Sequence, residues 1–163
     1  MFATIATLTA GVAMKVEGEI SVPAPREAVF SRLSDARFFA SCIDGVQDLT
    51  EIDATHYSAQ FATKIAYLRF TFKVTVAMTK LIAPGEIEAS VEGTPLGVVG
   101  RLTASARTNL AERGGQTDIH YVIDATLTGK LGSIGQPVLK AKAKEMEKQF
   151  AERLLAAFAE ARP

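Results

Sequence analysis

Tryptophan is absent from this chain of 163 residues, and Cys42 is its single cysteine. One cysteine excludes an internal disulfide, which agrees with a reducing cytoplasmic environment. Neither sign of charge prevails, since 18 basic residues offset 18 acidic ones. Nucleic-acid-binding domains usually carry a basic excess, so we predict no nucleic-acid partner. No segment contains the roughly 20 apolar residues that a membrane-spanning helix needs.

The first thirteen residues are mostly small and apolar, without lysine or arginine. A secretory signal peptide starts with positive charge and has a longer apolar stretch. We interpret residues 1–13 as a flexible N-terminal extension, because Met14 directly precedes the first clear strand; a leader or anchor is the alternative. No repeat, linker or low-complexity run divides the remainder, so residues 14–163 are predicted to form a single ligand-binding domain.

Apolar and polar residues alternate in several segments, which is typical of strands with one buried face. The longest such segment spans 67–78, where apolar residues from Leu68 to Met78 face one side. Turn signals stand at Pro84-Gly85 and Gly114-Gly115. The other predicted strands cover 15–22, 45–52, 55–65, 87–91, 98–110 and 119–127, with 45–52 irregular.

Helices are predicted directly after the first strand and at the end of the chain. Prolines end the first strand, and short helices follow at 26–33 and 36–41, the second capped by Asp35. From Pro137 onward, apolar residues recur at steps of three and four, which predicts one long amphipathic helix. This order of elements predicts an α+β fold in which a curved antiparallel sheet of six to seven strands wraps around the C-terminal helix.

The face of the sheet that should point inward is rich in small residues. A curved sheet lined by small groups can leave an apolar cavity, which is the usual form of a small-molecule site. The same residues could instead let the long helix lie close to the sheet, and periodicity does not separate the two interpretations. The small inward residues are Gly18, Ala59, Thr63, Ala89, Gly100, Ala104, Ala106 and Ala125.

Residue types that support catalysis or metal binding occur singly. His56 and His120 have no partners at metal-ligand spacing, and His120 shares with Asp118 a strand face that we predict to be solvated. Cys42 has no neighbouring base and is interpreted as a small core residue. The glycine-rich run 129–135 matches neither nucleotide-binding spacing. We therefore predict no catalytic residue, no metal and no cofactor.

Tyr57 and Tyr121 are predicted to point inward, where a hydroxyl group needs a hydrogen-bond partner. A backbone carbonyl is the favoured partner, and a ligand carbonyl such as a quinone oxygen is the alternative. On the long helix, Lys140, Lys144 and Lys148 form a stripe that anionic lipid headgroups could contact. Interleaved glutamates favour a solvated helix face instead.

Several short motifs resemble, in their order and spacing, those of the CoxG family of carbon monoxide dehydrogenase subunits, within the START-like (SRPBCC), birch-pollen-allergen-like superfamily. The motifs are Gly-Glu-Ile-Ser-Val-Pro-Ala-Pro-Arg-Glu-Ala-Val-Phe at 18–30, Leu-Ser-Asp at 33–35, Cys-Ile-Asp-Gly-Val at 42–46, Gly100, Gly-Gly-Gln-Thr at 114–117, Tyr-Val-Ile-Asp-Ala at 121–125, the glycine run 129–135 and Phe150. The resemblance covers about residues 14–158 and implies a helix-grip fold. Asp44 stands where the family often has proline, and Phe30 where it often has tryptophan. Many members carry a C-terminal membrane attachment, whereas this sequence ends at Pro163, so that attachment is not carried over.

The resemblance implies a non-enzymatic protein that binds a small hydrophobic ligand, quinone- or lipid-like, in an internal cavity. It would act as a carrier or as a membrane-recruitment accessory protein of a carbon monoxide dehydrogenase-type molybdenum hydroxylase, in the cytoplasm or peripherally at the inner face of the membrane. The alternatives are a polyketide cyclase- or dehydratase-like enzyme using the same cavity, and an interaction protein with a filled core. The two short helices and the loop 93–97 are expected to form the mouth. The residues expected to line the ligand site are Phe38, Phe39, Phe61, Phe70, Phe72, Tyr121, Met146 and Phe150.

Overall fold

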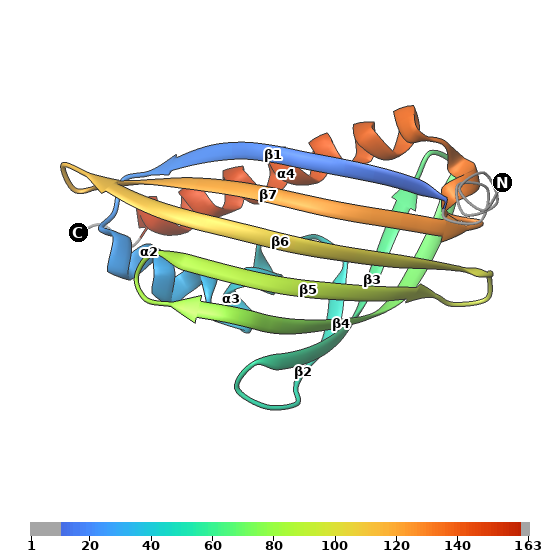
Figure 1. Ribbon diagram of the computed structural model, residues 1–163, viewed down its shortest axis with the longest axis horizontal. Helices are drawn as coiled ribbons and strands as arrows, with labels where there is room; N and C mark the ends of the chain where they lie inside the picture. Colours follow the sequence, from blue (N-terminus) through green and yellow to red (C-terminus); the bar gives the residue numbers. More distant parts are fainter. Residues whose placement is uncertain (1–10, 161–163) are drawn as a thin grey trace, which may run out of the picture.

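The computed structural model describes residues 11–160 and contains one antiparallel sheet, two short helices and one long helix (Figure 1). The seven strands follow the order β1-β7-β6-β5-β4-β3-β2 across the sheet. The elements are β1 (Val12–Val22), α2 (Arg26–Leu33), α3 (Ala36–Ser41), β2 (Val46–Glu51), β3 (His56–Ile65), β4 (Leu68–Ile82), β5 (Glu86–Pro95), β6 (Gly100–Arg113), β7 (Gln116–Gly129), the 3-10 helix η1 (Gly132–Ile134) and α4 (Gln136–Glu160). The predicted α+β helix-grip fold is confirmed.

The strand boundaries differ from the predicted ones at several places. β5 extends from Glu86 to Pro95, past the predicted 87–91, so the predicted loop 93–97 lies partly in a strand. β1 starts at Val12, so the last two residues of the predicted extension 1–13 belong to the sheet, and residues 1–10 lie outside the described part. β4 continues to Ile82 through an irregularity between Met78 and Lys80, which reverses the alternation. β6 starts at Gly100 instead of residue 98, because Val99 belongs to the connection from β5.

The predicted irregularity in β2 is confirmed. Its pairing with β3 shifts register between Gln47 and Thr50, where Asp48 has a positive φ of 54°. The short helices also begin as predicted. The Asp35 carboxylate accepts hydrogen bonds from the backbone N–H groups of Arg37 (3.0 Å) and Phe38 (3.4 Å), which caps α3.

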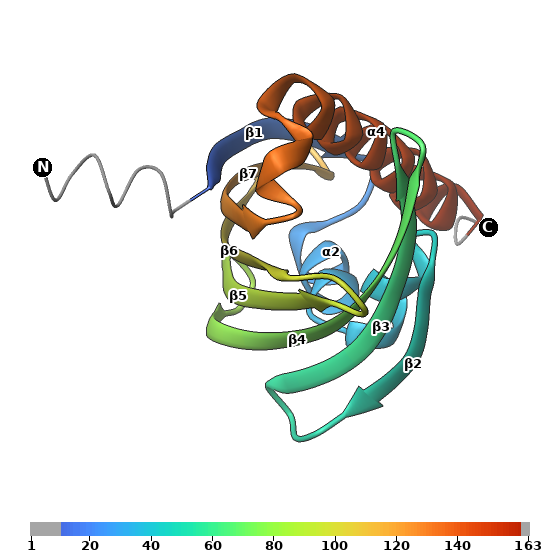
Figure 2. The same ribbon diagram turned by 90° about the vertical axis from the view of Figure 1, so that its right-hand side faces the viewer.

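The sheet curls strongly, and α4 spans the opening between its two sides (Figure 2). The helix packs mainly against β1 at one edge of the sheet and against β3 near the other edge. The central strands β5 and β6 therefore lie opposite the helix across the interior (Figure 2).

Buried apolar residues form two clusters, one at each end of the strands. The first core cluster comprises Ile20, Val22, Ala24, Val29, Leu33, Ile87, Leu110, Ile119, Leu154 and Phe158. The second core cluster comprises Met14, Ile65, Phe70, Phe72, Leu127, Leu131 and Leu139. The first fixes α2 and the C-terminal part of α4, and the second fixes the start of α4 against the β3–β4 hairpin. Stability from apolar burial is thus concentrated at the two ends of the interior.

Candidate functional site

The middle of the interior, between the two core clusters, is not closely packed. The inward-facing residues at the centres of β1, β7, β6 and β5 are only half-buried, whereas most inward-facing residues at the strand ends are buried. They are Val16, Ile123, Ala106 and Ala89, and in the next row Ala125, Ala104 and Val91. Ala143, Met146, Glu147 and Phe150 of α4 are half-buried as well. Val16, Ile123, Ala106 and Ala89 face the helix side of the sheet, so their partial exposure indicates that water reaches the space between sheet and helix.

One polar contact crosses this interior. The Tyr121 hydroxyl group on β7 donates a hydrogen bond to the Glu147 carboxylate on α4. Gly18 on β1 lies directly opposite Tyr121, and a Cβ atom at this position would overlap the tyrosine ring and hydroxyl. The glycine therefore provides the room in which the Tyr121 ring crosses β1 to reach α4.

The electrostatic setting keeps Tyr121 protonated. Burial raises the pKa of its hydroxyl above the ordinary value of 10.0, and the hydrogen bond to Glu147 and the charge of that carboxylate raise this pKa further. At neutral pH the pair is thus a neutral phenol donating to a carboxylate. Among the described residues, Tyr121 is the one inward-facing group whose pKa is strongly raised.

The predictions for the two inward tyrosines have different outcomes. The Tyr57 hydroxyl group donates to the backbone carbonyl of Ala54 at 2.8 Å, so the favoured partner was correctly predicted there. For Tyr121 the prediction of a backbone carbonyl is wrong, because Glu147 is the partner. The sequence holds no signal for this contact, since 26 residues separate the two side chains.

The eight residues predicted to line the ligand site fall into three groups. Phe61, Phe70 and Phe72 stack on one another at the second core cluster, with ring centroids 6.0 Å apart for Phe61–Phe72 and 5.9 Å for Phe70–Phe72. Phe70 and Phe72 are buried there, so they act as core residues that close one end of the space. Tyr121 packs against the first core cluster, and Met146 is half-buried on α4.

The third group lines a seam between α3 and α4. The Phe39 and Phe150 rings meet with centroids 5.0 Å apart, and the Arg32 guanidinium lies 5.1 Å from the centroid of Phe38. Phe38 and Phe150 pack against the first core cluster, whereas Phe39 remains exposed. The seam therefore borders the space on the side of the short helices, which were predicted to form the mouth.

Asp44 reinforces this seam and was missed as a site residue. Its carboxylate accepts a hydrogen bond from the side-chain amide of Gln149 and forms an ion pair with Arg153, and both partners belong to α4. The backbone N–H of Asp44 also donates to the Gln149 side chain at 3.3 Å. The sequence indicated this role only through the replacement of the family's frequent proline by Asp44, because an acidic residue can form contacts to α4 that proline cannot.

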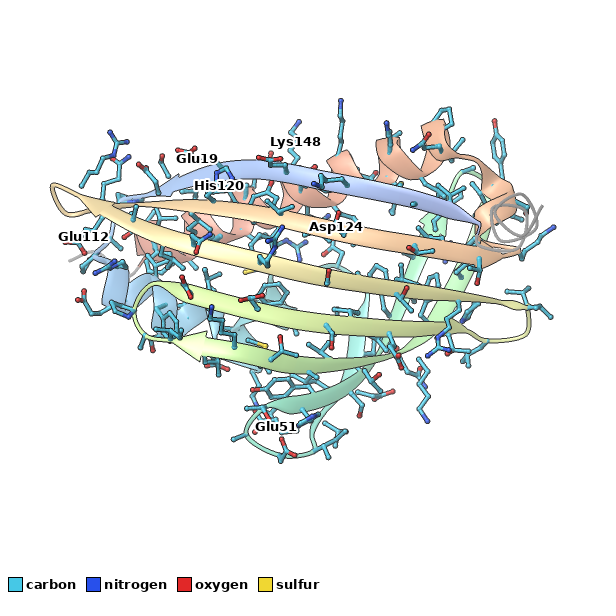
Figure 3. The ribbon with its side chains drawn as sticks, in the orientation of Figure 1. Glu19, Glu51, Glu112, His120, Asp124 and Lys148 are labelled. Atoms are coloured by element: carbon cyan, nitrogen blue, oxygen red, sulfur yellow. The ribbon has the colours of Figure 1, made fainter. Side chains whose placement is uncertain are left out.

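The outer face of the sheet carries two open hollows, of about 550 and 250 Å³. The larger lies over β1, β7 and β6 and the smaller over β3, β4, β5 and β6, and most side chains lining them belong to the outward alternation. Asp124, which lines the larger hollow, lies with Glu19 and His120 on the face turned away from α4 (Figure 3). Tyr57 is the inward-facing polar residue among the side chains that line the smaller hollow.

The remaining reactive side chains lie apart from the Tyr121–Glu147 contact. His56 forms an exposed hydrogen bond with Asp53 at 2.9 Å. Cys42 is buried, and burial raises the pKa of its thiol, which disfavours the nucleophilic thiolate. Asp118 points outward as predicted and accepts hydrogen bonds from Ser21 (2.8 Å) and Arg113 (2.6 Å). Within residues 11–160, no three His, Cys, Asp or Glu side chains are grouped so that they could hold a metal ion. No helix in the same range has the length and apolar character to cross a bilayer.

Comparison with solved structures finds the same fold in other proteins. A conserved protein from Geobacillus kaustophilus superposes with a TM-score of 0.83 at 24% identity, covering 91% of this chain and 97% of that one. A START superfamily protein from Mycobacterium smegmatis gives a TM-score of 0.70 at 14% identity, covering 91% and 99%. The Zhui aromatase/cyclase from Streptomyces sp. R1128 gives 0.66 at 14% identity, covering 91% and 94%. No curated protein matches the chain.

A family model gives the more specific assignment. The model for CoxG, a carbon monoxide dehydrogenase subunit, matches residues 18–158. This is most of the chain and includes the second half of β1, nearly all of α4 and the Tyr121–Glu147 contact. The family inferred from the short motifs is therefore confirmed, and the chain belongs to the CoxG family of carbon monoxide dehydrogenase subunits.

Proposed function

We propose that this protein binds a small hydrophobic ligand between the centre of its sheet and α4, without transforming it, and serves as an accessory protein of a carbon monoxide dehydrogenase-type molybdenum hydroxylase. The observation that carries the proposal is the set of half-buried inward side chains between the two core clusters. Family membership supports the accessory role and its partner.

The lining favours a ligand that is apolar over most of its surface. Alanine, valine, isoleucine and methionine side chains form most of it, and Tyr121–Glu147 is its charged contact. A quinone- or lipid-like molecule combines a large apolar body with one small polar head, which matches this distribution. Burial of apolar ligand surface contributes about 25 cal/mol per Å², from which the cost of association is subtracted.

Filling the space is a direct test. Ala106→Leu adds apolar volume on the inward face, and Ala111→Leu adds the same volume on the exposed face of the same strand. Each variant is melted with and without a short-chain quinone such as decylubiquinone. A ligand at 100 times its Kd stabilises the folded state by about 2.7 kcal/mol, so we expect the wild type and Ala111→Leu to gain several degrees and Ala106→Leu to gain far less.

Native mass spectrometry of freshly purified protein complements this test by detecting a co-purifying apolar molecule. The proposal fails if no such molecule is present and the quinone moves none of the melting temperatures. The stability of the Ala106→Leu variant is informative even without a ligand. In a closely packed interior the extra methyl groups cost about 1–3 kcal/mol, whereas open space accommodates them.

A second candidate is an enzyme of the cyclase type that uses the same space. The Tyr121–Glu147 contact favours it, because a protonated phenol beside a carboxylate supplies an acid and a base, and an aromatase/cyclase has a similar fold. Tyr121→Phe separates the candidates. An enzyme loses turnover of a polyketide substrate with little change in its affinity, whereas a carrier has no turnover and keeps most of its ligand affinity.

A further inference from the structure

Exposed apolar side chains gather at one end of the sheet. Of the eleven large apolar side chains exposed in residues 11–160, six lie in the β3–β4 turn, in the β5–β6 loop or at the start of α4. Tyr67 is 93% exposed and Val99 is 85% exposed. We call the β3–β4 turn (65–68) and the β5–β6 loop (96–99) together the sheet tip. The exposed apolar residues are Tyr67, Leu68, Leu96, Val98, Val99 and Val138.

Strand pairing puts the two parts of the sheet tip at the same end of the molecule. Ile65 pairs with Leu68, Phe72 pairs with Pro95, and Gly100 pairs with Gly129, so both connections and the end of β7 lie at the same end of the sheet. The backbone N–H of Lys130 donates to the carbonyl of Val99 at 2.8 Å, which joins the β5–β6 loop to the segment that leads into α4. Figure 2 faces this end of the sheet.

The charged residues of the three segments that meet at this end are all basic. The three segments 63–73, 94–101 and 127–144 contain eight of the 18 basic residues and none of the 18 acidic ones. The net charge of zero thus conceals a strong asymmetry along the molecule. Two of the eight have acidic partners outside these segments, since Arg101 pairs with Glu92 (2.9 Å) and Lys142 with Glu145 (2.7 Å). The eight are Lys64, Arg69, Lys73, Arg101, Lys130, Lys140, Lys142 and Lys144.

The positions of two of the basic residues destabilise the sheet when no anion is bound to them. Lys64 and Arg69 stand directly opposite each other on β3 and β4, at the base of the β3–β4 turn. Like charges in directly opposed positions destabilise a sheet. Both residues are exposed, and neither forms an ion pair with another described residue. An external anion would relieve this repulsion.

The turn between them is also unusual in composition. A two-residue β-turn normally carries glycine, asparagine or aspartate, whereas this one carries Ala66 and Tyr67. Ala66 has a positive φ of 57°, which an alanine adopts with strain. An apolar turn flanked by two cations combines a part that enters hydrocarbon with a part that contacts phosphate.

From these observations we propose that the sheet tip is a docking surface for an anionic lipid bilayer. Tyr67, Leu68 and the β5–β6 loop would enter the interface, and Lys64 and Arg69 would contact lipid phosphates. The contact differs from the lysine stripe 140–148 considered above, which lies along the helix and includes acidic neighbours. The proposal does not depend on a ligand in the interior, so either can fail without the other.

Vesicle co-sedimentation tests the proposal with the full chain. The protein is mixed with vesicles of phosphatidylcholine alone and with vesicles of phosphatidylcholine and phosphatidylglycerol in equal amounts. Each basic residue near an anionic surface contributes about 1 kcal/mol. We therefore expect binding only to the anionic vesicles, weakened about 30-fold in Lys64→Gln/Arg69→Gln and reduced further at high salt.

Matched variants show whether the effect belongs to the sheet tip. Arg37→Gln/Arg107→Gln removes two exposed basic residues elsewhere, and Leu81→Ser/Ile82→Ser removes two exposed apolar residues near the opposite end. These variants should bind as the wild type does, whereas Tyr67→Ser/Val99→Ser should not. Equal losses in all variants, or equal binding to both kinds of vesicle, would overturn the proposal. A variant lacking residues 2–10 should keep its binding, and loss of binding in this variant with retention in the tip variants would also overturn the proposal.

A fluorescent reporter gives an answer that does not depend on affinity. Because the chain lacks tryptophan, Tyr67→Trp places a single tryptophan at the tip. Its emission should shift to shorter wavelength on addition of anionic vesicles, whereas Ile82→Trp should show no shift. A shift at position 82 with none at position 67 refutes the proposed orientation.

Discussion

Replacement of Gly18 by alanine tests whether the Tyr121–Glu147 contact is held as described. The backbone of Gly18 is ordinary for a strand, so alanine introduces no backbone strain there. Its methyl group would instead overlap the hydroxyl oxygen and Cζ of Tyr121. The tyrosine ring has to rotate away, and its hydroxyl then leaves the Glu147 carboxylate.

The expected loss follows from the contact that is broken. A hydrogen bond to a charged group contributes about 1.5–3 kcal/mol when buried, and we expect about 1–2 kcal/mol at this half-buried site. Alanine recovers part of this loss, because a glycine inside a strand costs roughly 0.5–1 kcal/mol relative to alanine. We expect Gly18→Ala to lower the free energy of unfolding by about 1 kcal/mol, measured by urea denaturation at neutral pH.

Gly93 offers a matched control. It also lies on the inward face, and an added Cβ would meet its nearest neighbour, Leu102, at an ordinary 3.5 Å. Gly93→Ala should therefore be neutral or slightly stabilising. The decisive measurement is Gly18→Ala in a Tyr121→Ala background, where the methyl group meets no ring and should behave like Gly93→Ala. If the cost of Gly18→Ala persists in that background, the steric explanation is wrong.

Three further predictions concern stability and ligand exchange. Because burial and Glu147 raise the pKa of Tyr121 in the folded state, its stabilising contribution is complete below about pH 10 and declines at higher pH; alkaline unfolding should show this decline in the wild type and a smaller one in Tyr121→Phe. Thr117 is fully buried and its hydroxyl donates to the Ala24 carbonyl at 2.7 Å, so Thr117→Val should cost about 1–2 kcal/mol in urea denaturation, and an unchanged midpoint would contradict this role. Asp44→Ala removes the contacts to α4 at the seam, and because these contacts are exposed we expect a change in the free energy of unfolding below about 1 kcal/mol. Stopped-flow measurements should instead show faster release of a bound quinone. An unchanged release rate would argue against ligand entry at the seam.

The sequence predicted the strands well where alternation was regular and poorly where it was interrupted. From β1 to β7, alternation identified the inward face correctly, because burial of one face imposes a period of two. It did not predict the extension of β4, since the irregularity after Met78 changes the phase and leaves Leu81 and Ile82 exposed. Val98 and Val99 resembled the start of a strand, although they lie in an exposed loop.

The contacts around the interior were less accessible to prediction. Single aromatic residues were identified, but their grouping depends on how α4 crosses the sheet, and periodicity contains no information on that crossing. Phe39 meets Phe150 and Tyr121 meets Glu147 only because α4 is anchored at both ends. The basic sheet tip was missed for a related reason, since a total charge of zero gives no sign of segregation along the fold.

The way in which α4 is held explains why open space can persist beneath it. Its two ends are fixed by the core clusters, and its middle is connected by directional contacts from Tyr121 and from Asp44. Opposite the helix, Ala104 and Ala106 are too short to fill the gap. Apolar side-chain surface that water reaches contributes no burial energy, so a ligand that covers it would add about 25 cal/mol per Å² of apolar surface removed from water. A bound hydrophobic ligand would therefore stabilise the fold without a movement of α4.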